Sequence, residues 1–192
     1  MELELDNSYA MFKVSSDTVF KPFDCGDEDL NEFLLKKAIQ YANEHLATTF
    51  VIENESVTVA YYSIFNDSVN AQNIAFASKT AFKRFLQDLV SHPKRHLKSY
   101  PAIKIGRLGV TKTIQNSGLG KMIVNSIIEL AINANENCAC KIITVDAYAQ
   151  SLKFYERLGF KFFSESDKGN DTRQMYLNLT PIILAAIENP ES

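Results

Sequence analysis

The sequence has few cysteines. Its 192 residues include Cys25, Cys138 and Cys140, and three thiols cannot all pair with one another. The single residue between Cys138 and Cys140 is also too short a spacing for an ordinary disulfide or a zinc knuckle. We therefore expect reduced thiols, buried or at the edge of an element, in a cytoplasmic protein.

The sequence also lacks a long apolar run. No segment approaches the roughly eighteen apolar residues that a membrane-spanning helix needs, and Glu2 and Glu4 make the start of the chain unlike a signal peptide. Neither internal repeats nor low-complexity tracts are present. With 46% hydrophobic residues, the chain can bury a core without disulfides. We expect one cytoplasmic domain over residues 1–192 and no membrane partner.

The sequence has little net charge, and acidic residues slightly outnumber basic ones, 23 to 20. The net charge of −3 is unlike that of a typical nucleic-acid-binding protein. Residues 79–98 differ, because six basic residues against the single acid Asp88 give a net charge of about +5. These basic residues are Lys79, Lys83, Arg84, Lys94, Arg95 and Lys98. The segment either steers phosphates or is a solvated helix face followed by a polar loop. His92 and His96 lie four residues apart, but Pro93 interrupts the turn, so we predict no metal site.

Two of the few glycines lie where an apolar strand gives way to a helix. Gly118 and Gly120 follow a predicted strand over residues 102–110 and begin a predicted helix over residues 118–135. A helix N-terminus carries unpaired amides and partial positive charge, and glycines let oxygen atoms approach those amides. The residues that we expect to surround a phosphate are Gln115, Asn116, Ser117, Gly118, Leu119, Gly120 and Lys121. The alternative is a helix start that binds no ligand.

Two phosphate-binding motifs can be excluded for this loop. The nucleotide-hydrolase loop needs a glycine where Gln115 stands and a serine or threonine where Met122 stands. The dinucleotide fingerprint needs a third glycine at the position of Ile123. What remains is Gln-x-x-Gly-x-Gly after a strand.

A second motif follows about thirty residues later. Residues 142–147 are rich in β-branched side chains, and residues 150–160 are typical of a short helix that ends at Gly159. This helix contains Phe-Tyr-Glu-Arg-Leu-Gly-Phe, with the tyrosine at position 155. Leu152, Tyr155 and Leu158 have helical spacing, so Tyr155 alone could be a core aromatic.

The remaining pattern predicts a mixed α/β protein. We predict strands over residues 12–14, 48–52, 57–65, 102–110, 141–146, 161–164 and 174–179, and helices over 28–45, 79–90, 118–135 and 150–160. Asp27 is expected to cap the helix over 28–45, and strands 48–52 and 57–65 to form a hairpin. Residues 74–77 are either a short strand or a loop.

Together these motifs resemble the GNAT family of N-acetyltransferases, over nearly the whole chain. The glycine motif resembles the loop that binds the pyrophosphate of acetyl coenzyme A, and the tyrosine motif resembles the second conserved block of the family. Residues 23–34, 48–51, 60–63 and 106–110 are similar to the branch that includes toxins of toxin–antitoxin pairs, which acetylate aminoacyl-tRNA. The resemblance implies a GNAT-like fold, with a central mixed β-sheet flanked by helices.

The resemblance also implies roles for individual residues. Acetyl coenzyme A would be held by the glycine loop, by Ser151, and along the strand by Leu108, Gly109 and Val110. Tyr155 would lie near the sulfur and hydrogen-bond the departing thiolate, because a thiol pKa of about 8.5 lies below a phenol pKa of about 10. The acceptor amine would attack the thioester directly, without a covalent acetyl-enzyme.

The sequence leaves the acceptor unassigned. We expect a primary amine, and the alternative is aminoacyl-tRNA, with a small ribbon-helix-helix antitoxin and a second copy of the chain as protein partners. A further alternative is a module that binds coenzyme A as a sensor or scaffold without turnover. Tyr155 and both loop glycines favour the enzyme.

Overall fold

The computed structural model describes residues 9–74, 76, 78–90 and 97–188. Within them the strands form one mixed seven-stranded sheet in the order β1-β2-β3-β4-β5-β7-β6. The strands are β1 Ala10–Lys13, β2 Thr48–Glu53, β3 Thr58–Asn70, β4 Ser99–Val110, β5 Ile142–Tyr148, β6 Lys161–Phe162 and β7 Thr172–Asn178. The helices are α1 Glu28–Glu32, α2 Ala38–Asn43, α3 Lys79–Leu89, α4 Leu119–Ala134, α5 Leu152–Arg157 and α6 Thr180–Glu188. A π-helical turn, η1 (Phe33–Lys37), and two 3₁₀ turns, η2 (Lys112–Ile114) and η3 (Ala149–Ser151), complete the elements.

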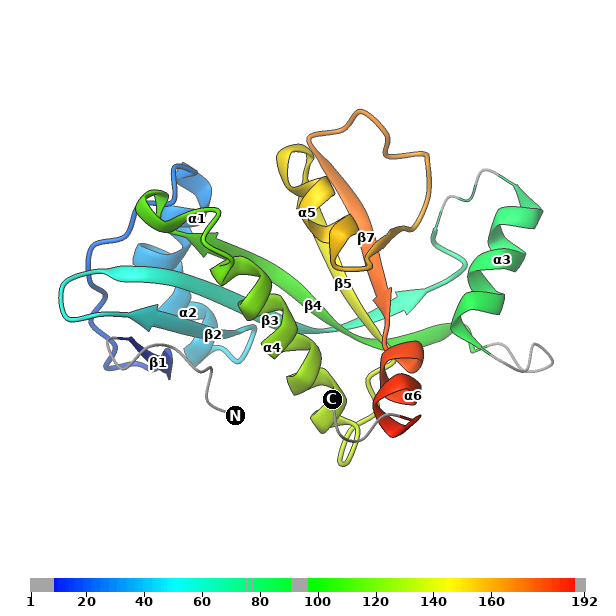
Figure 1. Ribbon diagram of the computed structural model, residues 1–192, viewed down its shortest axis with the longest axis horizontal. Helices are drawn as coiled ribbons and strands as arrows, with labels where there is room; N and C mark the ends of the chain where they lie inside the picture. Colours follow the sequence, from blue (N-terminus) through cyan, green and yellow to red (C-terminus); the bar gives the residue numbers. More distant parts are fainter. Residues whose placement is uncertain (1–8, 75, 77, 91–96, 189–192) are drawn as a thin grey trace. The chain divides into compact units, whose positions relative to one another are not determined.

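The chain divides into two compact units. Unit 1 comprises residues 1–66 and 105–127, and unit 2 comprises residues 67–104 and 128–192. Strands β3 and β4 and helix α4 therefore each contribute residues to both units (Figure 1). The single domain expected from the length stays a prediction.

In unit 1, the helices before β2 pack against an antiparallel set of strands. Strand β1 pairs with β2, and β2 pairs with β3, with Val51 opposite Phe12 and Tyr61. Asp27 caps α1 as predicted, because its side chain accepts a hydrogen bond from the Leu30 amide at 3.0 Å. The predicted helix over 28–45 is confirmed, although η1 interrupts it. It ends at Asn43, and His45 in the turn that follows has a left-handed φ of 56°.

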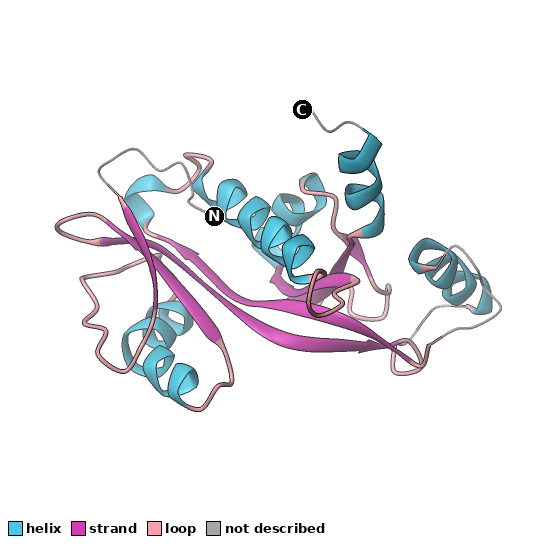
Figure 2. Ribbon diagram, turned by 90° about the horizontal axis from the view of Figure 1, so that it is seen from below, coloured by secondary structure: helices cyan, strands magenta, loops and turns pink. Residues whose placement is uncertain are grey.

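Tyr61 is the centre of this packing. It is fully buried, its hydroxyl donates to the Leu30 carbonyl at 2.7 Å, and its ring stacks on Phe33 at 6.2 Å. These contacts hold the α1–α2 segment on one face of the strands, and the first half of α4 covers the other face (Figure 2).

In unit 2, helix α3 packs on strands whose core-facing residues include Tyr100 of β4 and Tyr176 of β7. The core joins Val69, Phe85, Leu89, Tyr100, Ile142 and Tyr176, among others. The Phe85 ring meets Tyr176 edge-on at 5.2 Å. Asp88 closes the contact, since it accepts from Lys161 Nζ at 2.7 Å and from the Tyr176 hydroxyl at 3.3 Å.

The structure adds to the sequence-based expectations at the end of β3, at the C-terminal helix α6 and at residues 74 and 76. Strand β3 extends five residues beyond the predicted end at Phe65, to Asn70. Helix α6 was not predicted, because Pro-Ile-Ile-Leu-Ala-Ala-Ile is apolar on every face and shows no helical period. Ile74 and Phe76 lie outside any strand, which favours the loop alternative there, while residues 75 and 77 lie outside the described residues.

No helix among the described residues has both the length and the apolar character needed to cross a membrane.

Candidate acetyl-donor site

The glycine loop forms as the sequence predicts, between β4 and α4 in unit 1. Strand β4 ends at Val110, η2 follows, and α4 begins at Leu119 (Figure 1). Asn116 and Gly118 have φ values of 64° and 95°. Because glycine tolerates the left-handed region, Gly118 lets the chain turn sharply into the helix, and a Cβ there would meet nothing within 4 Å.

The first turn of α4 has free hydrogen-bonding capacity. Its first helical bond runs from the Met122 amide to the Gly118 carbonyl at 3.1 Å, so the amides of residues 119–121 have no acceptor within the helix. The Leu119 amide makes only a long contact, 3.4 Å, with Ser117 Oγ. No acidic residue lies in this turn. The donors and the helix dipole together suit an anionic ligand.

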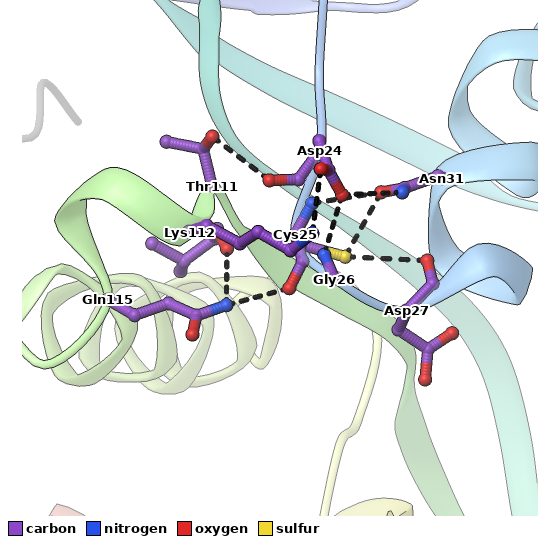
Figure 3. Close-up of polar contacts among 9 residues, drawn as sticks. Asp24, Cys25, Gly26, Asp27, Asn31, Thr111, Lys112 and Gln115 are labelled. Carbon is purple, nitrogen blue, oxygen red and sulfur yellow. Dashed lines mark hydrogen bonds and ion pairs between the residues drawn. The ribbon is translucent and has the colours of Figure 1, made fainter.

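The side chain of Gln115 is used to fix the loop. Its Nε2 donates to the Cys25 carbonyl at 2.8 Å and to the Val110 carbonyl at 3.0 Å (Figure 3). The amide group thereby links the end of β4 to the turn before α1.

Asp24 strengthens the same link. Its carboxylate accepts from the Gly26 amide at 2.8 Å and from Asn31 Nδ2 at 3.0 Å, and it pairs with Lys112 Nζ at 2.9 Å (Figure 3). The Asp24 carbonyl also accepts from the Lys112 amide at 3.0 Å. The hydrogen bond from Lys112, followed by those from Asn31 and Gly26, lowers the pKa of Asp24 to about 2.

We expect this carboxylate to make stability depend on acid pH. A lowered pKa contributes stability above the unfolded value of about 3.9, and the contribution is lost as the pH falls towards 2. The melting temperature of Asp24→Asn should therefore lie below that of the wild type at pH 7, and the gap should narrow from pH 4 to pH 2. Glu129→Gln, at an exposed helix position, is the control. A gap that stays constant over this range contradicts the assignment.

The strand residues predicted to hold the donor's arm lie at the end of β4. Leu108 and Val110 are half-buried and Gly109 is buried. A Cβ at Gly109 would lie 2.8 Å from the Tyr61 ring and 3.0 Å from the Phe23 ring. Close packing against these two rings therefore explains why position 109 is a glycine, whatever the strand binds.

Tyr155 lies in α5, in unit 2, with Ser151 at the end of η3 just before it. The Tyr155 side chain is 5% exposed, and its ring centre lies 5.0 Å from that of Phe154 and 5.2 Å from that of Phe160. Burial raises the pKa of its hydroxyl well above the usual value, so the group is neutral at working pH. The predicted site residues thus fall into two groups, with residues 108–121 in unit 1 and Ser151 and Tyr155 in unit 2.

The basic segment lies partly within the described residues. Lys79, Lys83 and Arg84 are exposed on α3, and Lys98 is exposed before β4. Lys94, Arg95, His92 and His96 lie outside the described residues.

The two buried thiols, Cys25 and Cys140, are structural in character. Cys25 and Cys140 are buried and Cys138 is exposed, and all three are free. Burial raises the pKa of Cys25, whose Sγ lies 3.2 Å from Asn31 Oδ1 (Figure 3). A raised thiol pKa makes a poor nucleophile. Among the described residues, no three histidine, cysteine or acidic side chains gather as metal ligands would.

Comparison with known proteins identifies the family. Residues 51–175 match the model of the acetyltransferase (GNAT) domain. Among solved structures, the crystal structure of a bacterial toxin is 18% identical, with a TM-score of 0.75 over 94% of this chain and 95% of that one. A tyrosine-to-phenylalanine mutant of KacT is 19% identical, with a TM-score of 0.74 over 93% and 99%.

AtaT complexed with acetyl-methionyl-tRNAfMet is also 19% identical, with a TM-score of 0.72 over 92% of this chain and 98% of that one. At such identities the structural likeness shows a shared fold, while the family model spans most of the chain. The fold and family expected from the two motifs are confirmed, and the chain belongs to the acetyltransferase (GNAT) domain family.

Proposed function

We propose that the chain transfers the acetyl group of acetyl coenzyme A to a primary amine. The observation that carries the proposal is the first turn of α4, where the amides of residues 119–121 have no helical acceptor and Gly118 turns the chain at a φ of 95°. A pyrophosphate matches this set of donors in charge and in hydrogen bonding.

In this proposal, unit 1 binds acetyl coenzyme A on both sides of the loop that joins β4 to α4. The amides of residues 119–121, which have no helical acceptor, hold the pyrophosphate, and Lys121 adds a positive charge at the exposed rim. Backbone groups of Leu108, Gly109 and Val110 bind the pantetheine arm. An amide of this strand stabilises the negative oxygen that develops on the thioester carbonyl, and such a donor is typically worth about 3 kcal/mol of barrier.

The transfer step needs a neutral amine and a stabilised leaving group. The amine nitrogen forms a bond to the carbonyl carbon, the carbon–sulfur bond breaks, and the amine's surplus proton passes to water. Tyr155 donates a hydrogen bond to the departing thiolate. The raised pKa keeps its hydroxyl protonated and makes it a poor proton donor to sulfur. Its contribution is therefore charge stabilisation more than proton delivery.

The direct test uses the full chain, acetyl coenzyme A and a panel of primary amines. Calorimetry measures donor binding, and release of the free thiol measures transfer. Binding with amine-dependent thiol release supports the enzyme. Binding without release from any amine, including charged tRNA, supports the sensor or scaffold alternative instead.

A second candidate acceptor is aminoacyl-tRNA. Lys79, Lys83 and Arg84 are exposed on α3 and form no ion pair with another described residue. The one acid of this helix, Asp88, pairs with Lys161 at 2.7 Å. The helix thus presents positive charge that is not neutralised, in a chain whose net charge is −3. The likeness to AtaT in complex with acetyl-methionyl-tRNAfMet supports the same acceptor.

If charged tRNA is the acceptor, Lys83→Glu/Arg84→Glu should abolish its acetylation and leave acetyl coenzyme A binding unchanged. Each neutralised phosphate releases counterions, so wild-type affinity should fall steeply with salt, by a logarithmic slope of about 0.9 per phosphate for a duplex. Small amines should show no such slope. The matched control is Lys13→Glu/Lys36→Glu, which changes the net charge equally at two exposed positions of unit 1.

Radiolabelled acetyl coenzyme A incubated with total charged tRNA measures the outcome. Absence of label from every aminoacyl species excludes this acceptor. If the RNA is labelled, a ribbon-helix-helix antitoxin encoded beside the chain and a homodimer become the protein partners to test, by co-purification and by light scattering.

A further inference from the structure

Arg107 is a cation without a counterion in strand β4. Its Nη1 donates to the carbonyl of its own neighbour, Gly106, at 2.8 Å, and its guanidinium carbon lies 5.2 Å from the centre of the Phe33 ring. Its Nε is enclosed and has no hydrogen-bond partner. No carboxylate among the described residues forms an ion pair with it. By contrast, Arg173 pairs with Asp167 at 3.0 Å.

Packing alone does not account for this side chain. A half-buried guanidinium that is left without a carboxylate and with an unpaired donor is unfavourable compared with an apolar side chain of similar size. A leucine or methionine could cover the Phe33 ring without that cost. The positive charge therefore has a use that the isolated chain does not supply.

The position of Arg107 along β4 indicates what that use is. This step rests on the proposed function. If the pyrophosphate lies at the start of α4 and the pantetheine arm runs back along Val110, Gly109 and Leu108, the acetyl end lies about three residues, roughly 10 Å, up the strand. Arg107 is the next residue. Residues 107 and 109 are two positions apart and therefore lie on the same face of the strand. Phe33 of η1 and Tyr61 of β3 pack on this face.

We infer that Arg107 binds an oxyanion of the acceptor and thereby selects acceptors that carry one near the amine. The planar guanidinium presents a fixed fork of donors that suits a carboxylate or a phosphate, and the Phe33 ring holds it in place. The oxyanion is either the carboxylate of a free amino acid or peptide, or the phosphate of the terminal nucleotide of an aminoacylated RNA. A nearby positive charge also favours the neutral, reactive form of the acceptor amine.

The test compares acceptors of nearly the same shape that differ in the anion. One pair is leucine and leucinamide, and the other is an aminoacyl-adenosine with and without its 5′-phosphate. The wild type should favour the anionic member of one pair at least tenfold in kcat/KM. That pair shows whether the oxyanion is a carboxylate or a nucleotide phosphate. Arg107→Gln should remove the preference through KM, Arg107→Lys should keep part of it, and acetyl coenzyme A affinity should not change. Lys36→Gln, at an exposed position of η1, should keep the full preference.

Equilibrium binding makes the result independent of turnover. The N-acetylated form of each compound is titrated into the wild type and into Arg107→Gln, both saturated with coenzyme A. The anionic member should bind at least tenfold more tightly to the wild type only. Equal binding of both members, or the same ratio in Arg107→Gln as in the wild type, overturns the inference. Absence of acetyl transfer to all four acceptors, with the binding preference intact, contradicts the proposed function and not the role of Arg107.

Discussion

Tyr155→Phe should lower kcat by roughly ten- to a thousandfold, with little change in acetyl coenzyme A affinity. The substitution keeps the ring that packs between Phe154 and Phe160 and removes only the hydroxyl. A tyrosine that serves the core alone would leave turnover nearly unchanged. Because no described residue forms a hydrogen bond with this hydroxyl, its loss should also change the melting temperature little.

Tyr176→Phe is the matched control, since it removes a hydroxyl from an equally buried tyrosine of the same unit. That hydroxyl donates to Asp88 at 3.3 Å, so its loss should lower stability and spare kcat. Thiol release under saturating acetyl coenzyme A measures both variants. If kcat of Tyr155→Phe stays within twofold of the wild type, Tyr155 serves the core alone and takes no part in catalysis.

The direction of the Tyr155 pKa shift adds a pH criterion. Burial raises this pKa above the usual value of about 10, so the hydroxyl is protonated throughout the working range. A fall in kcat of the wild type between about pH 7 and pH 9.5 therefore cannot come from ionisation of Tyr155.

The sequence predicted the features that depend on local signals. Asp27 caps α1 through the amide three residues later, and Gly118 turns the chain directly into α4. Both effects act within a few residues, so the pattern around each position suffices to find them. The strand before the loop and the helix after it carry clear apolar periods, which is why both elements could be predicted.

Features that depend on distant contacts were not visible in the sequence. The Gln115 side chain bonds to the carbonyl of Cys25, ninety residues earlier in the chain. Gly109 is a glycine because the rings of Tyr61 and Phe23 approach it. Neither partner can be read from the motif that contains the residue. The unpaired state of Arg107 is likewise a property of its surroundings, because any carboxylate of the chain could have been placed beside it.

Gly120→Glu should lower the affinity for acetyl coenzyme A at least tenfold, which corresponds to about 1.4 kcal/mol. Gly120 is the second residue of α4, where the amides of the first turn have no helical acceptor. A glutamate there places a side chain and a negative charge where we propose the pyrophosphate. An acidic residue in the first turn suits the helix dipole. The variant should therefore fold, and the loss should be specific to the ligand.

Gly120→Gln separates charge from size, because it adds nearly the same volume without the negative charge. If the loop binds the pyrophosphate, calorimetry should rank the affinities as wild type, then Gly120→Gln, then Gly120→Glu, and the gap between the two variants should shrink as salt screens the charge. Circular dichroism establishes that each variant is folded. A folded Gly120→Glu that binds acetyl coenzyme A as tightly as the wild type would place the donor elsewhere, since no bound pyrophosphate could tolerate a carboxylate among its amide donors.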